Sequence, residues 1–569
     1  DQTSYLMFSD TTRNVGSIGY FHGSDAMVFR VGAGTRMQLD SNSVISLSNN
    51  DGNTSNTIFG KSAWQQASNV GADYNTIFGQ EAMGAGNIGA AERNTGIGMA
   101  VMNEITTGDS NVAVGADALY NLTEGNDNIA IGRQALGATT TGGENVAIGR
   151  QAMQDLTGGA GANVGIGYGA MLDVDEGTGG GDTDYNIAIG YHALKGGDFG
   201  GNDRQLRGNV AIGAFALDAT AANGHTGTIA IGESALTALT SGARNTAIGY
   251  QAGMGMTVGE DNVAIGYQAL TGTSTSTANQ RNTAIGVGSM AGTNAGAGQN
   301  VAIGYGTLDA NMTSAADNNT ALGYISLSAV TSGPNNTAVG ASSLLVCSTG
   351  GYNVAVGARS GDALVDGEYN VFLGEFAGST TTSVNNAVFI GQSAGAGGDV
   401  SADGTVAIGL SALTALTSGA GNLAIGHQAL YGHTTGARNI AIGYGAMDGT
   451  GAATVKDSND NIMIGNDAGG GTWTTNKSQY NLGIGSYVMD AAMNGANYNV
   501  GLGYAALGGL ISGDSNVAVG ADTLTQTTTG GANTAVGYQA LTGDADGDGA
   551  DNTAIGHKAM LAAVSPSKN

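Results

Sequence analysis

The sequence is poor in the residues that supply cross-links, kinks and charge in most soluble proteins. It holds one cysteine and two prolines among 569 residues, and charged residues make up only 11%. Because Cys347 is alone, no disulfide within the chain stabilises the fold. No apolar run approaches about eighteen residues, which excludes a conventional transmembrane helix. Stability must therefore come from burial and from backbone hydrogen bonds.

Positive charge is especially scarce. Lysine and arginine together number 18 against 45 aspartates and glutamates, giving a formal net charge of −27. Nucleic acids and anionic membranes bind basic surfaces, so this balance disfavours both as partners. We therefore expect no nucleic-acid binding and no membrane insertion, and the charge fits an extracellular, soluble, self-repelling particle.

What the chain has in abundance is one short phrase. Between Asn56 and Gly556 the sequence Asn-Thr-Ala-Ile-Gly, or a near copy, recurs twenty-eight times. We call it the repeat phrase, and its last residue the repeat glycine. Successive repeat glycines most often lie 17 residues apart, as Gly132 and Gly149 do, and extra residues enter only between phrases. Such a pattern predicts an all-β parallel β-roll, or β-solenoid, of about 28 coils over residues 51–560.

The repeat phrase reads as a short strand that is apolar on both faces. Alternation places Ile131 and Ile148 on one face and Ala130 and Ala147 on the other. We predict that the branched residues point into the coil and stack as a hydrophobic column. The alanine face is then expected to be covered by a partner chain, since strands apolar on both sides are buried on both sides. A second short strand is predicted after each repeat glycine.

Asparagine begins nearly every phrase, for example at Asn111, Asn128 and Asn145. Its amide bonds to backbone groups at a bend, and its backbone tolerates left-handed dihedral angles. The sequence therefore predicts a ladder of asparagines that ties each coil to the next.

The phrase also carries a resemblance. Asn145-Val146-Ala147-Ile148-Gly149 resembles the head-domain repeats of trimeric autotransporter adhesins, and the longer unit Asn262–Leu270 is similar to repeats in bacteriophage tail fibres. The resemblance implies a homotrimeric fibre, with two identical partner chains. It implies an extracellular structural or attachment role, first as a phage tail-fibre shaft on a virion tail. The alternative is a cell-surface trimeric adhesin or an extracellular filament of a bacterium or archaeon.

The same resemblance implies what the fibre contacts. A host surface glycan or protein receptor is expected at its binding parts, and a baseplate or a cell envelope at its anchor. Residues 1–50 contain alternating segments that read as short strands, and they resemble the β-rich modules of phage tail fibres. Residues 561–569 are a C-terminal tail that ends in the polar residues 565–569. The resemblance implies that such a tail is compatible with a processing end, from which a C-terminal chaperone has been removed.

Two features stand outside the repeat as candidate binding residues. Asp544, Asp546 and Asp548 have the spacing that begins a calcium loop, but the twelfth position is Ile555 where glutamate would close the site. This favours a solvated acidic spacer over a calcium site. Trp473 lies in a glycine-rich spacer and is the candidate for a surface contact.

The sequence contains no pattern that supports a catalytic site or a cofactor site. The six histidines have no metal-ligand spacing and form no triad pattern with Cys347. Tyrosines recur directly after the repeat glycine, and this fixed position favours packing at a bend over stacking on sugars. We expect no enzyme activity and no cofactor; a polysaccharide-degrading enzyme, the remaining alternative, requires paired carboxylates in a groove.

Overall fold

The structure is a computed structural model in which the chain divides into two compact units, Asp1–Asp261 and Asn262–Asn569. Its described part consists of strands and turns and contains no helix. The described residues are 3–9, 14–22, 26–31, 34–39, 45–46, 55–64, 71–83, 88–157, 159–174, 182–196, 205–219, 224–273, 276–277, 279–398, 400–450, 457–543 and 549–561.

The first unit begins with an antiparallel sheet of five strands, each paired with the next along the chain. Ala26 and Val28 are its most buried described side chains. The structure places these five strands within residues 3–46. They are β1 (Thr3–Ser9), β2 (Asn14–Phe21), β3 (Ala26–Val31), β4 (Gly34–Leu39) and β5 (Ile45–Ser46).

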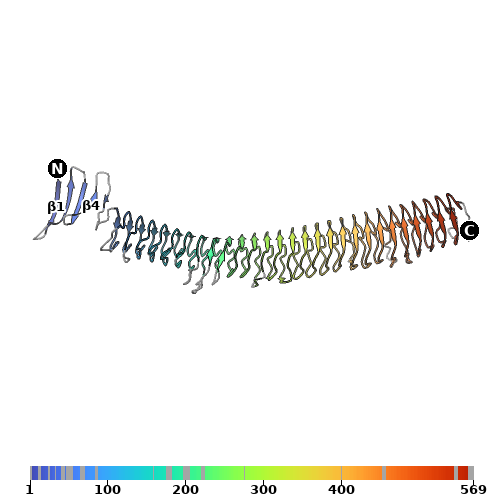
Figure 1. The fold of residues 1–569 in the computed structure, drawn as a ribbon, viewed down its shortest axis with the longest axis horizontal. Helices are drawn as coiled ribbons and strands as arrows, with labels where there is room; N and C mark the ends of the chain where they lie inside the picture. The colour runs from blue at the N-terminus through green and yellow to red at the C-terminus, as the bar shows by residue number, and fades with distance from the viewer. Residues whose placement is uncertain are drawn as a thin grey trace. The chain divides into compact units, whose positions relative to one another are not determined.

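The rest of the first unit is a parallel β-solenoid, in which the repeat phrases supply one three-residue strand per coil (Figure 1). Strands pair in register, so that Ala130 lies opposite Ala147 and Ile131 opposite Ile148. The described ladder strands of this unit are β6 (Thr57–Phe59), β7 (Thr76–Phe78), β8 (Thr95–Ile97), β9 (Val112–Val114), β10 (Ile129–Ile131), β11 (Val146–Ile148), β12 (Val164–Ile166), β13 (Ile187–Ile189), β15 (Val210–Ile212), β17 (Ile229–Ile231) and β18 (Thr246–Ile248). A spacer pair, β14 (Leu206–Arg207) with β16 (His225–Thr226), lies beside them in sequence.

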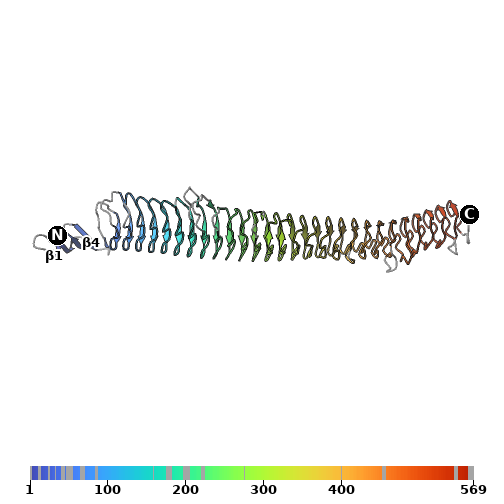
Figure 2. The same cartoon turned by 90° about the horizontal axis from the view of Figure 1, so that it is seen from below.

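The second unit repeats the same construction, and Figure 2 shows its strands stacked side by side as in Figure 1. Its described ladder strands are β19 (Val263–Ile265), β20 (Thr283–Ile285), β22 (Val301–Ile303), β24 (Thr320–Leu322), β25 (Thr337–Val339), β26 (Val354–Val356), β27 (Val371–Leu373), β28 (Val388–Ile390), β29 (Val406–Ile408), β30 (Leu423–Ile425), β31 (Ile440–Ile442), β32 (Ile462–Ile464), β33 (Leu482–Ile484), β34 (Val500–Leu502), β35 (Val517–Val519), β36 (Thr534–Val536) and β37 (Thr553–Ile555). One spacer pair, β21 (Asn294–Ala295) with β23 (Met312–Thr313), accompanies them. The predicted parallel β-solenoid is confirmed.

The prediction of which face points inward was wrong. Ala130 and Ala147 have no exposed surface and lie inside the coil, whereas Ile131 and Ile148 are 38% and 36% exposed on its outside. The physical reason is the small interior of the coil. Leucines that follow the repeat glycine, such as Leu136, already fill much of it, so the strand can place only a small side chain such as alanine beside them. The alanine column is therefore core within one chain, and no partner chain is needed to cover it.

Size compensation along the core supports this reading. Where the alanine position becomes Phe372, the residue four places after a repeat glycine, usually leucine or methionine, becomes glycine at Gly361 and Gly378. A Cβ on either glycine would lie within 2.8 Å of the Phe372 ring. Phe372 also stacks on Phe389 of the next coil at 5.4 Å between ring centroids, as the repeat spacing predicts.

The second predicted strand is absent from the described coils, and the segment after the repeat glycine is a series of turns. Alternate residues there take positive φ, for example 58° at Asp117 and 52° at Leu119. Their amides still bond between coils, that of Asp117 to the Met99 carbonyl and that of Leu119 to the Ala135 carbonyl, each at 3.0 Å. The coil is thus tied to its neighbours on this side too, without forming an extended strand.

The repeat glycine is required by the close approach of successive coils. Gly115 has φ of 130°, and a Cβ there would lie 2.7 Å from the carbonyl of Gly132 in the next coil. A side chain at this position would therefore both strain the backbone and push the coils apart.

The predicted asparagine ladder is present. The Asn111 side-chain oxygen accepts from both the backbone amide and the side-chain Nδ2 of Asn128, each at 3.0 Å. The same Nδ2 donates to the Gly142 carbonyl at 2.9 Å, and the Asn128 oxygen accepts from the Asn145 amide at 3.1 Å. Each buried asparagine thus satisfies backbone groups that the bend leaves without partners.

Candidate functional site

The outward side of the strand ladder is the main candidate for an interaction surface. The second and fourth residues of each phrase, mostly valine and isoleucine, project from it, while the third is buried. We call this row of outward side chains the branched face. In each unit it continues from coil to coil, because the strands pair in register. Contiguous apolar surface of this extent is rare on soluble monomers and marks an interaction site.

Exposed tyrosines border the branched face on both sides. One set directly precedes the asparagine, where Tyr480 and Tyr498 stack at 5.1 Å between centroids and 9° between planes. The other directly follows the repeat glycine, where Tyr305 and Tyr324 stack at 5.5 Å. Packing of the second set was expected, and these rings do pack on one another across coils. They nevertheless remain largely exposed, so both rows add aromatic surface to the edges of the face.

The sequence-predicted contact at Trp473 was wrong. The Trp473 side chain has no exposed surface, and its indole Nε1 donates to the Gly469 carbonyl at 3.0 Å. It fills the interior of a coil whose glycines leave room for a large ring. The calcium candidates Asp544, Asp546 and Asp548 lie outside the described residues.

Two other buried groups occupy interior positions of the same kind. His433 is fully enclosed, and its ring nitrogens lie 3.1 Å from the Thr450 hydroxyl and 2.9 Å from the Gly436 carbonyl. Desolvation lowers the pKa of His433 to about 4, so the ring is neutral at pH 7. Burial raises the pKa of the Cys347 thiol to about 12, which leaves it unreactive. Both act as core residues.

Within the described ranges, no group of three or more histidine, cysteine, aspartate or glutamate side chains is placed to hold a metal ion. Among the same residues, no helix has the length and apolar character to cross a membrane.

Three aspartates of successive coils in the second unit influence one another. Desolvation, together with the charges of Asp467 and Asp448, raises the pKa of Asp490 to about 6. Burial likewise raises the pKa of Asp448. Because the folded state holds the Asp490 proton more tightly than the unfolded chain does, the coil gains stability as pH falls from about 6 towards 4.

We predict that Asp490→Asn stabilises this region at pH 7 by roughly 1 kcal/mol, allowing for solvent screening of a half-exposed group. The amide cannot ionise, so the gain should vanish near pH 4, where Asp490 is protonated in the parent chain. Urea titrations followed by the fluorescence of buried Trp473, at both pH values, measure this. Asp366→Asn, which changes an exposed carboxylate, is the control. An unchanged pH dependence in Asp490→Asn would contradict the prediction.

Comparisons with known proteins do not identify a family for this chain. The sequence matches no protein-family model, and no curated protein shows significant similarity to it.

Proposed function

We propose that three copies of this chain pack their branched faces around a common axis to form a homotrimeric fibre. What supports this is the regularity of the face. A partner must offer apolar side chains with the same rise of about 4.8 Å per coil, and a second copy of the same ladder has that rise by construction. The resemblance of the repeat phrase to trimeric fibres favours three copies.

The energetics favour association. Full burial of a valine or isoleucine contributes about 1.5–3 kcal/mol, so covering the exposed third of such a side chain contributes about 0.5–1 kcal/mol. Five ladder strands of the second unit have threonine at the second place of the phrase, which leaves 29 outward valine, isoleucine and leucine side chains. Together they supply up to roughly 15–30 kcal/mol per chain. Association costs an estimated 4–15 kcal/mol in lost freedom. The apolar gain therefore exceeds the cost.

The biological role that we propose is attachment. A stiff, acidic, repeat-built fibre holds a binding region away from the particle that carries it, and repeated weak contacts along it add up through multivalency. A phage tail-fibre shaft joined to a baseplate is our first assignment. A trimeric adhesin or extracellular filament anchored in a bacterial or archaeal envelope is the second. Cryo-electron microscopy of native material distinguishes them by what the fibre is joined to.

Sedimentation equilibrium of the purified chain tests the assembly. Each chain has a mass of 56.0 kDa, and we expect the particle to have three times that mass. A particle of one or two chains at micromolar concentration would contradict the trimer.

A further inference from the structure

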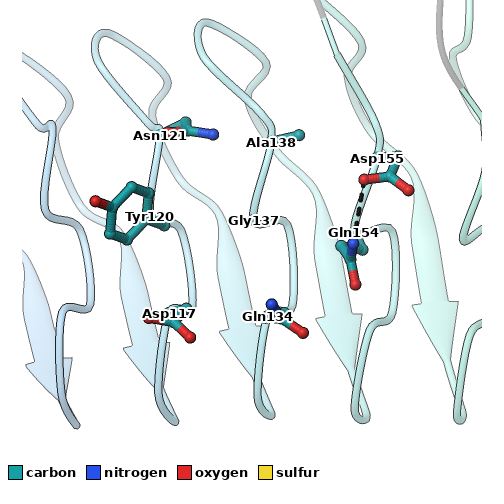
Figure 3. A pocket seen from close by; sticks show the side chains of 8 residues that line it. All are labelled: Asp117, Tyr120, Asn121, Gln134, Gly137, Ala138, Gln154 and Asp155. Atoms are coloured by element: carbon teal, nitrogen blue, oxygen red, sulfur yellow. Dashed lines mark hydrogen bonds between the residues drawn. The ribbon is translucent and has the colours of Figure 1, made fainter.

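A second surface feature lies on the turns that follow the repeat glycines of β9, β10 and β11 in the first unit. Residues at equivalent places in these three coils lie side by side in neighbouring coils (Figure 3). Tyr120 and Asn121 stand in one coil and Gln154 and Asp155 two coils later, while the coil between them has Gly137 at the first of the two places. The missing side chain leaves a groove of about 450 Å³ between two polar walls.

The groove results from side-chain choice and not from a backbone requirement. Gly137 does not have a left-handed backbone, and a Cβ there would meet only the Gln134 carbonyl, at an ordinary 3.4 Å, and more distant atoms. Other coils have large residues at this place, such as Leu172. The fold therefore accepts a side chain at Gly137, and its absence opens the groove.

Hydrogen bonds between the coils and along one wall frame the groove. The Asn121 amide donates to the Gly137 carbonyl at 3.2 Å, and the Ala138 amide donates to the Gln154 carbonyl at 2.9 Å. On the far wall, Gln154 accepts from the Gln151 side chain at 2.7 Å and donates to Asp155 at 3.2 Å. Side chains fixed in this way lose little freedom when a ligand binds.

The chemistry of the lining selects one class of ligand. Asp117 and Asp155 accept hydrogen bonds, and the amides of Asn121 and Gln134 both donate and accept. Two carboxylates disfavour an anion, and the lining has no positive charge. Tyr120 adds an aromatic ring at the edge, against which an apolar C–H face can pack. Alternating hydroxyls and C–H faces are the pattern of a neutral sugar.

We propose that this groove binds one neutral hexose unit of a surface glycan. The identification of that glycan as a receptor rests on the attachment role proposed above, but binding to the groove does not. The lining residues come from the turns and not from the branched face, so the same residues are not required for both assembly and sugar binding.

The test uses the full chain and four probes, the methyl glycosides of glucose, galactose, mannose and N-acetylglucosamine, titrated by saturation-transfer NMR. We expect at least one to bind with a Kd on the order of 1 mM, typical of a single small ligand. Gly137→Leu fills the groove and should weaken binding at least about tenfold, equivalent to about 1.4 kcal/mol. Tyr120→Ala, which removes the aromatic wall, should weaken it in the same direction.

Thr237→Leu is the matched control, because Thr237 is also five residues after a repeat glycine in the first unit and does not line the groove. Its sugar binding should equal that of the parent chain. Absence of binding by all four probes, equal binding by Gly137→Leu, or equally tight binding of anionic N-acetylneuraminate would overturn the proposal. Sedimentation reports assembly separately, so failure of the groove and failure of the trimer are distinguishable.

Discussion

Glutamate at Ile131, Ile148 and Ile166 together is expected to weaken the trimer strongly while leaving the coils folded. These side chains lie on the outside of three successive coils. In the proposed assembly they are buried between chains, where an unpaired carboxylate costs several kcal/mol. Nine such groups would face one another in one trimer. We expect the guanidinium concentration that dissociates the trimer to fall sharply, with sedimentation as the measurement.

The matched control places glutamate at Thr123, Thr140 and Thr157, which occupy one spacer position in three successive coils, those of β9, β10 and β11. It stacks the same number of like charges at the same spacing, but away from the branched face. Its dissociation midpoint should stay close to that of the parent chain. If both triple variants dissociate alike, the branched face is not the contact between chains.

Ala147→Glu is expected to have the opposite effect to the triple glutamate variant. It should destabilise the coils around Ala147 locally, while the chains of the trimer stay associated. Ala147 is fully buried within its own chain, so the carboxylate enters the core between β10 and β12. A cost of at least about 3 kcal/mol should speed amide hydrogen exchange in residues 129–166 roughly a hundredfold through local opening. Mass spectrometry of exchanged peptides measures this.

Thr140→Glu, on the exposed turn of a neighbouring coil, is the control and should leave exchange unchanged. The result to watch for is the reverse outcome, in which the Ala147→Glu coils stay protected but the chains separate. That outcome would show that the alanine side chains are buried between chains, and it would contradict their place in the core of a single chain.

The period, the parallel pairing and the asparagine ladder were predictable because each depends on local chemistry. Gly115 must be glycine where the next coil approaches, and Asn128 must be an amide that both donates and accepts. The direction of the faces was not predicted correctly. Alanine is apolar and small, so it suits a tight core and a close interface equally well. The pairing of the large Phe372 with Gly378 indicates that the alanine position points into the coil, because the two residues share the same interior space.

The turns after the repeat glycine were harder to predict. Asp117 and Leu119 adopt positive φ, which residues other than glycine rarely do, and the bonds to neighbouring coils that offset this cost are long-range. The groove at Gly137 is of the same kind. It can be predicted from the sequence only once it is known that residues 17 apart, such as Tyr120, Gly137 and Gln154, lie at equivalent places in neighbouring coils.

Single-cysteine cross-linking tests the central claim most directly. Cys347 is buried with its pKa raised to about 12, so it should not react with a bis-maleimide. With cysteine at Ile148, on the branched face, we predict covalently linked chains after treatment of the native particle. With cysteine at Thr140, on the exposed turn, we predict labelled single chains. Linked chains from Thr140→Cys and only single chains from Ile148→Cys would contradict the account.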